Sequence, residues 1–174
     1  DSLIKQGMLD SEGRLIQPDG LSEELAERFR GTMSGREFVL SYGDNKFPHD
    51  ICINQEDINQ IQLAKGAVFA ACKALMAALE ASEEDIEEIF LADASSATIR
   101  PDVALGLGLL PPVDASRIIN IGNAAWQGAY LALSNASYLE QSEKIATLLE
   151  GLDLTSDLIY AEEFINAMNF DIER

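Results

Sequence analysis

Two segments of the sequence combine small residues with polar side chains in a way that could serve a bound ligand. The first, 62–67, contains Gln62 and places Lys65 directly before Gly66 in an otherwise apolar stretch. Glycine inside a helix costs about 1 kcal/mol relative to alanine. A glycine and a charged side chain in a helix that looks buried therefore indicate that another part of the molecule approaches closely.

The second segment, 91–97, follows an apolar run and contains two serines and an aspartate. If the apolar run is a strand, these residues lie at its carboxyl end, which is where α/β proteins bind ligands. A third segment, 122–129, is a junction between an apolar run and a helix, opened by Gly122 and Asn123. Small residues at such junctions most often serve only close packing, so each signal alone is weak.

Other chemically capable residues are isolated in the sequence. His49 is the one histidine, and the two cysteines, Cys52 and Cys72, lie in apolar surroundings without a second histidine near them. We interpret His49 as a surface residue and both cysteines as small packing residues. The acidic run 80–88 lacks the spacing of a calcium loop and is better explained as a solvated helix start. We predict no catalytic residue and no metal ligand.

The element that must position Lys65 is a long helix, predicted over about 55–80. Asn54 is a good helix cap, and an acidic residue three positions later approaches a capping box. Apolar residues then recur at helical spacing, namely Ile58, Ile61, Ala64, Val68, Ala71, Leu75 and Leu79. We expect this helix to be largely buried. Trp126, on a later helix, is either a core residue or an exposed contact, and the sequence leaves both open.

Short apolar strands alternate with helices through the rest of the chain. We predict strands at 88–92, 117–121 and 152–155, and helices at 101–107, 123–133, 137–150 and, capped by Ser156, 157–168. This alternation is typical of parallel βαβ packing. The first 53 residues differ: they predict a helix at 23–30 and a hairpin of strands 37–42 and 49–53.

Composition restricts the function further. The 174 residues are 47% hydrophobic and 24% charged, which fits one globular domain. Thirty acidic against twelve basic residues give a net charge of −18, which argues against nucleic acid and against an anionic membrane surface as partners. Two cysteines cannot build a disulfide framework, so we expect a cytoplasmic location. The chain opens without methionine, and we expect a fragment or a processed product.

Five segments, taken in order, resemble one family. They are 54–67, 85–92, 104–111, 122–129 and 163–170, and the stretch 7–14 is similar as well. The family comprises the reductive activators of corrinoid proteins, ferredoxin-linked ATPases of the acetate and sugar kinase/Hsp70/actin (ASKHA) superfamily. The resemblance implies an α/β fold, a partial RNase H-like lobe of the actin/Hsp70/sugar kinase type with short parallel strands, packed helices and an inserted hairpin.

The resemblance also implies an activity for the longer family protein. ATP with magnesium binds between two lobes and drives a conformational change, so that a low-potential electron reduces cob(II)alamin to cob(I)alamin on a corrinoid partner and restores methyl transfer. Residues 1–174 would be a single domain, the C-terminal part of the second lobe, with 1–53 as an insertion and 54–174 as an αβαβα core. The first lobe and the iron–sulfur cluster would lie upstream, so we expect the chain alone to be inactive. Its partners would be a corrinoid protein, the upstream lobe and, through an unpaired strand edge, a second copy of the chain.

By the same resemblance, Gln62 and Lys65 would face the adenosine, and Asp93, Ala94, Ser95 and Ser96 the phosphate or ribose. Gly122 and Asn123 would complete the nucleotide site. The family's glycine-rich turn, A-G-A-F-G-N, is replaced here by 92–97, which has no glycine and carries Asp93. A side chain crowds a backbone that should approach the nucleotide, and a carboxylate repels a polyphosphate unless a metal intervenes. The alternatives are therefore a degenerate, non-hydrolysing lobe that docks proteins, or an unrelated small α/β domain.

Overall fold

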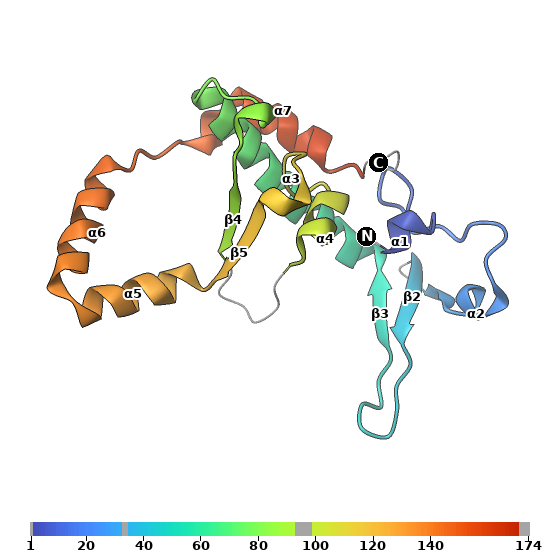
Figure 1. Ribbon diagram of the computed structural model, residues 1–174. Helices are drawn as coiled ribbons and strands as arrows, with labels where there is room; N and C mark the ends of the chain where they lie inside the picture. Colours follow the sequence, from blue (N-terminus) through green and yellow to red (C-terminus); the bar gives the residue numbers. More distant parts are fainter. Residues whose placement is uncertain (1, 33–34, 93–98, 171–174) are drawn as a thin grey trace.

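The computed structural model describes residues 2–32, 35–92 and 99–170 (Figure 1). It has a mixed α/β architecture with a three-stranded antiparallel sheet, a two-stranded parallel sheet and helices between and around them. The elements, in chain order, are α1 (Ser2–Lys5), α2 (Glu23–Ala26), β1 (Phe29–Thr32), β2 (Gly35–Ser41), β3 (Ile51–Asn54), α3 (Gln55–Ala78), β4 (Ile89–Ala92), α4 (Pro101–Gly106), β5 (Ile118–Gly122), α5 (Ala124–Ser134), α6 (Ala136–Leu148) and α7 (Leu158–Ala167).

The antiparallel sheet has the strand order β1-β2-β3. The predicted hairpin is confirmed, with Phe38 of β2 opposite Ile53 of β3. The predicted helix 23–30 is wrong in its second half, because α2 ends at Ala26 and Phe29 begins a strand. Pairing decides this: Phe29 lies opposite Phe38, and the two rings meet edge to face at 5.0 Å.

The parallel sheet pairs β4 with β5, as the alternating pattern predicted, with α4 between them in sequence. The third predicted strand, 152–155, is wrong, since Leu154–Ser156 forms a 3-10 turn. Asp153 stabilises this turn by accepting a hydrogen bond from the Thr155 amide at 2.9 Å. The final helix is capped one residue later than predicted, by Asp157, which accepts from the Tyr160 amide.

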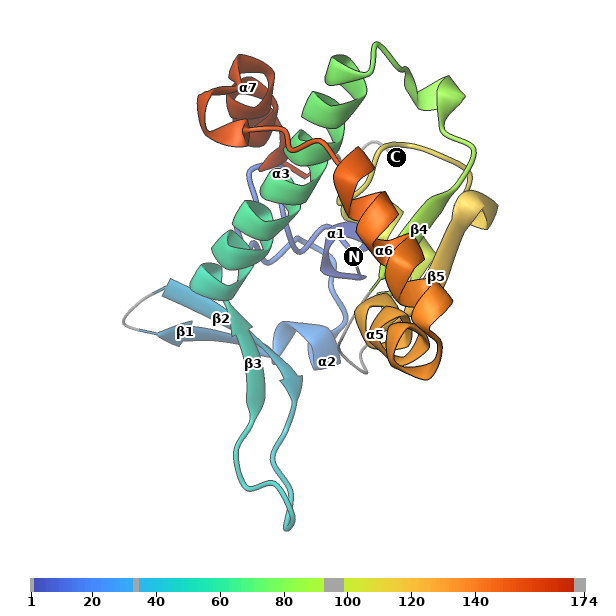
Figure 2. The ribbon, with the colours of Figure 1, turned by 90° about the vertical axis from the view of Figure 1, so that its left-hand side faces the viewer.

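Helix α3 begins with the predicted capping box. The Asn54 side chain accepts from the amides of Glu56 and Asp57, and the Asp57 carboxylate accepts from the Asn54 amide at 2.9 Å. Its 24 residues meet the length and composition of a membrane span. Its polar side chains nevertheless donate hydrogen bonds to the backbone directly after α7, and Figure 2 shows α7 lying beside the helix.

The face of α3 that is buried differs from the prediction. The predicted apolar stripe is covered only in part, and Val68, Leu75 and Leu79 are 42%, 50% and 76% exposed. Ile58 is buried as predicted, but the other buried residues of α3 are Gln62, Lys65, Gly66, Ala70 and Ala74, none of which belongs to the predicted stripe. Contact with α7 selects this face, because a helix can approach closely only where the side chains are small or can bond to it.

Two separate hydrophobic clusters hold the described residues together. The larger joins the N-terminal segment, β2, the start of α3 and the chain after α7, through Ile4, Met8, Leu9, Leu15, Phe38, Ile58 and Phe170. The smaller lies between α4 and β5 and consists of Ala104, Leu110 and Ile118. Helices α5 and α6 pack on each other, contain no buried residue and extend away from the body (Figure 1). Trp126, on α5, is 65% exposed and stacks on Tyr130 at 5.8 Å.

Candidate functional site

Gly66 is the point at which α3 and α7 approach each other. A Cβ atom on Gly66 would lie 3.1 Å from the backbone oxygen of Phe164 and 3.3 Å from the Cγ of Met168. Both are closer than ordinary van der Waals contact, so a side chain at this position would push α7 away. The expectation that a neighbouring segment closely approaches this glycine is confirmed.

Gln62, one turn earlier on the same face, joins three segments. Its amide nitrogen donates to the backbone oxygen of Glu12 at 3.0 Å and to that of Met168 at 2.9 Å. The side chain is buried, and a Cβ on Gly13, whose φ is +78°, would lie 2.5 Å from it. Gln62 thus fixes the N-terminal turn and the end of α7 on α3.

Lys65 contacts the carboxyl end of α7. Its Nζ donates to the backbone oxygen of Ala167 and, at 2.8 Å, to that of Asn169. It also lies 5.2 Å from the centre of the Phe170 ring. The last carbonyls of a helix lack partners within the helix and carry its negative dipole end, so a buried cation stabilises them. Lys65 is 3% exposed, so protein groups replace nearly all of the water around its ammonium group.

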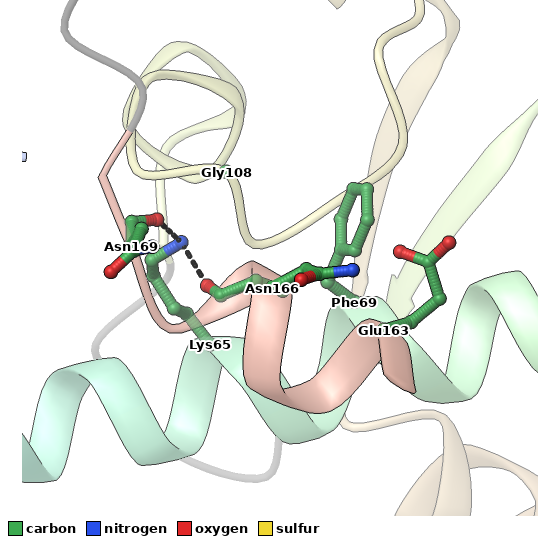
Figure 3. Close-up of a pocket in the computed structure, with 7 residues that line it drawn as sticks. Lys65, Phe69, Gly108, Glu163, Asn166 and Asn169 are labelled. Carbon is green, nitrogen blue, oxygen red and sulfur yellow. Dashed lines mark hydrogen bonds between the residues drawn. The ribbon is translucent and has the colours of Figure 1, made fainter. Parts of the chain in front are cut away.

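A pocket of about 190 Å³ opens beside this contact. It is lined by Lys65, Phe69, Gly108, Glu163, Asn166, Ala167 and Asn169. Figure 3 shows the lysine ammonium beside Asn169 at the carboxyl end of α7, with the Phe69 ring and the polar groups of Asn166 and Glu163 along the pocket. An aromatic face together with an amide and a carboxylate could hold a small planar group with hydrogen-bond donors.

The second group of predicted residues lies at the carboxyl edge of the parallel sheet. Ala92, which ends β4, is paired with Gly122, which ends β5. Gly122 has a φ of +64° and open space around its missing side chain. Asn123 accepts a hydrogen bond from the Trp126 amide at 2.9 Å and so caps α5. The other N-terminal amides of a helix attract anions.

A wider hollow of about 440 Å³ lies on this sheet, lined by Phe90, Leu91, Ala92, Ile99, Leu109 and Asn120. It is mainly apolar and shares no lining residue with the pocket at Lys65. The structure therefore brings Gln62 and Lys65 together at one site, and Gly122 and Asn123 at another. The remaining predicted site residues, Asp93, Ala94, Ser95 and Ser96, lie outside the described residues.

Three of the pocket residues were not predicted from the sequence, namely Glu163, Asn166 and Asn169. The available signal was the spacing of three between Glu163 and Asn166, which places both on one face of α7, whereas Asn169 lies beyond the end of the helix. That segment contributed to the family resemblance only as a whole. These residues could not be assigned to the pocket beforehand, because α7 is far from Lys65 in sequence and meets it only through tertiary packing.

Three further side chains could do chemistry, namely those of His49, Cys52 and Cys72. His49 is exposed, as predicted, and Cys52 and Cys72 are free thiols of intermediate burial. Burial raises the pKa of the Cys72 thiol, which disfavours the reactive thiolate form. In the acidic run, Ser82 holds the Asp85 carboxylate and lowers its pKa. Across residues 2–32, 35–92 and 99–170, no three histidine, cysteine or carboxylate side chains gather as metal ligands.

The parallel strands and the packed helices form a mixed α/β architecture. Residues 1–174 match the family model described as the C-terminal domain of RACo, the ASKHA domain, and the chain belongs to this family. The solved structure named "Reductive activator for corrinoid,iron-sulfur protein" superposes with a TM-score of 0.85 at 27% identity, covering 97% of this chain and 26% of that one.

A relative of similar identity is the "Corrinoid activation enzyme RamQ" of Eubacterium limosum. It is 28% identical over 166 residues, which cover 94% of this chain and 28% of the relative. The chain thus spans about a quarter of the length of these two proteins. Both are named for the activation of corrinoid proteins.

Proposed function

We propose that this chain is the C-terminal lobe of an ATP-dependent activator that supports the reduction of cob(II)alamin to cob(I)alamin on a corrinoid protein and so restores methyl transfer. The observation that carries the proposal is the match of all 174 residues to the family model. The two named relatives, reductive and corrinoid activators, support the same role.

The residues at the carboxyl edge of the parallel sheet suit a nucleotide. The apolar hollow beside Phe90 and Leu109 could cover a purine ring, and the amides at the start of α5 could face a phosphate. Gly122 leaves space for a close approach of the ligand. Nucleotide contacts by Gln62, Lys65, Asp93, Ala94, Ser95, Ser96, Gly122 and Asn123 remain part of the proposal.

In this proposal, bound ATP with magnesium supplies the free energy that favours one arrangement of the lobes. A nucleotide can drive an unfavourable reduction only if it binds two states of the protein with different affinity. Gln62 and Lys65 would contribute by fixing α7 to α3, so that the pocket beside them moves as one body with the lobe. The iron–sulfur cluster that provides the electron would lie in the upstream part of the polypeptide.

The upstream part would also cover the apolar surface that this chain leaves open. Parallel sheets are normally covered on both faces, yet Phe90 is 56% exposed. On α5 and α6, Leu133 and Leu148 are 89% and 79% exposed. We therefore propose that residues 1–174 form one domain completed by the upstream lobe, in a protein of the cytoplasm, where its free thiols stay reduced.

The second candidate is a degenerate lobe that docks proteins without hydrolysing ATP. The replacement of the glycine-rich turn by 92–97, with Asp93, favours it. The two candidates differ in nucleotide binding, because a degenerate site binds Mg-ATP weakly or not at all.

The test is a calorimetric titration of the intact parent protein with Mg-ATP, followed by a spectroscopic assay of cob(I)alamin formation on a corrinoid protein. Binding together with ATP-dependent cob(I)alamin formation is the expected result. A folded protein that binds no Mg-ATP would favour the docking role, and binding without cobalt reduction would refute the proposed reaction.

A further inference from the structure

Asn120 is a polar residue on the inward face of β5. Successive side chains of a strand point to opposite faces, so Asn120 shares a face with Ile118, which packs in the smaller hydrophobic cluster. Asn120 is half-buried there and lies opposite Leu91 of β4. An amide group at this position loses water, so it needs hydrogen-bond partners in the protein or in a ligand.

A bulge at the end of β5 gives this side chain one partner. Ala92 lies opposite Gly122 instead of Ile121, so β5 contains one residue more than β4 over this stretch. The Asn120 Oδ1 accepts a hydrogen bond from the Gly122 amide at 2.9 Å. Because a backbone amide can only donate, the oxygen of the Asn120 side chain faces Gly122 and the orientation of its amide group is defined. Bulges beside binding sites often redirect a side chain in this way.

The nitrogen of the Asn120 amide can donate to a further partner. Within residues 2–32, 35–92 and 99–170, no protein group accepts a hydrogen bond from this Nδ2. Asn120 also lines the hollow of about 440 Å³ on the parallel sheet. The other described residues that line the hollow are apolar, namely Phe90, Leu91, Ala92, Ile99 and Leu109. These six residues therefore offer a ligand apolar contact and one side-chain hydrogen-bond donor.

The junction that carries Asn120 is fixed by two more side chains. Gln127 of α5 donates from Nε2 to the backbone oxygen of Ile121 at 3.1 Å. Asn123 caps α5 by accepting from the Trp126 amide. Strand, bulge and helix are thus bonded to one another before any ligand arrives, and a donor that is already positioned loses little entropy on binding.

Resting on the proposed function, we propose that Asn120 is the residue that selects adenine as the base of the bound nucleotide. Its Nδ2 donates to a ring nitrogen of the purine, while the apolar side chains of the hollow cover the ring. Adenine presents acceptor nitrogens and a single amino group, whereas guanine carries two N–H donor groups on one edge. The described lining residues offer these donors no side-chain acceptor, because the Asn120 oxygen is bound to Gly122. A buried donor without a partner is costly, so guanine binds more weakly.

The test compares the affinities of the intact parent protein for Mg-ATP and Mg-GTP by calorimetry. The unaltered protein should bind Mg-ATP at least about tenfold more tightly. Asn120→Asp keeps an oxygen for the Gly122 amide and replaces the donating nitrogen with an accepting oxygen, which suits the N–H groups of guanine. The added charge repels both triphosphates alike, so the ratio of the two affinities isolates the base. We expect this ratio to fall at least about tenfold.

Asn135→Asp is the matched control. Asn135 caps α6 by accepting from the Ser137 amide at 2.9 Å, so the same substitution is made at the same kind of hydrogen bond outside the hollow. The ratio of its affinities for Mg-ATP and Mg-GTP should equal that of the unaltered protein.

A second measurement needs no substitution and therefore does not depend on the folding of a variant. The unaltered protein is titrated with 1-deaza-ATP, 3-deaza-ATP and 7-deaza-ATP, each of which lacks one acceptor nitrogen of the adenine ring. The analogue that lacks the nitrogen bonded to Asn120 should bind at least about tenfold more weakly than ATP.

Each result decides the proposal. An unchanged affinity ratio in Asn120→Asp, the same change in the Asn135→Asp control, or binding of all three analogues as tight as that of ATP would overturn the role of Asn120. Equal affinities of the unaltered protein for Mg-ATP and Mg-GTP would overturn it as well, and the proposed function would stand. If the protein selects ATP through Asn120 but forms no cob(I)alamin, the proposed function fails and the role of Asn120 stands. A folded protein that binds neither nucleotide would refute both.

Discussion

Lys65→Met should loosen α7 from α3, because it keeps the length of the side chain and removes the ammonium group. The group donates to the carbonyls of Ala167 and Asn169 and is 3% exposed. Each of these two hydrogen bonds from a charged group contributes about 1.5–3 kcal/mol, so the pair contributes about 3–6 kcal/mol. Part of this is offset in the variant, because methionine removes the cost of taking a charged group out of water. We expect a net loss of about 2–4 kcal/mol in the stability of this contact.

Hydrogen exchange of residues 158–170 in the intact parent protein measures this loss. A change of about 2–4 kcal/mol corresponds to roughly 30- to 800-fold faster exchange, since about 1.4 kcal/mol is a factor of ten. The matched control is Lys73→Met on the same helix. Lys73 pairs with Glu83 at 3.0 Å, but both side chains are partly exposed, so at most about 1 kcal/mol is at stake.

Exchange in α7 that is no faster in Lys65→Met than in Lys73→Met would refute the assignment of Lys65 as the stabilising partner of α7. If Lys65→Met weakened only Mg-ATP binding and left exchange unchanged, the lysine would act on the nucleotide. The two readouts therefore separate a positioning role from a contact with the ligand.

Gly66→Val should lower the free energy of unfolding in urea by about 1–3 kcal/mol, because its side chain meets the backbone of Phe164; an unchanged midpoint would contradict the close approach. Cys72 should react with iodoacetamide more slowly in the folded protein than in urea at pH 8, because its raised pKa leaves less thiolate; equal rates by mass spectrometry would exclude this. The pKa of Asp44 is lowered because its carboxylate accepts hydrogen bonds from the amides of Phe47 and Lys46. The ionised carboxylate therefore stabilises the loop between β2 and β3 at pH values above 3.8, the ordinary pKa, and this contribution is lost as the pH falls through the lower pKa of the folded state. An NMR titration should place that transition below pH 3.8. Asp93→Gly should tighten Mg-ATP binding if the 92–97 turn faces the nucleotide, and unchanged calorimetric affinity would count against that assignment.

Local chemistry allowed the sequence to predict several elements of the fold. Asn54 and Asp57 cap α3 as their spacing of three residues indicates, and the apolar runs at β4 and β5 pair in parallel as expected. Asn123 begins α5 directly after β5. In each case the deciding interactions lie within a few residues or follow from regular alternation, so they can be read from the sequence.

Tertiary contacts decided what local chemistry left open. The buried face of α3 is the one that carries Gln62 and Lys65, because carbonyls about one hundred residues later accept their hydrogen bonds. The strand at Phe29 exists because β2 pairs with it, while 152–155 has no strand to pair with among the described residues and turns as a 3-10 segment. Sequence alone determined where most helices and strands begin. Only the packing of distant segments determined which faces meet, because the free energy of burying a face depends on the partner that covers it.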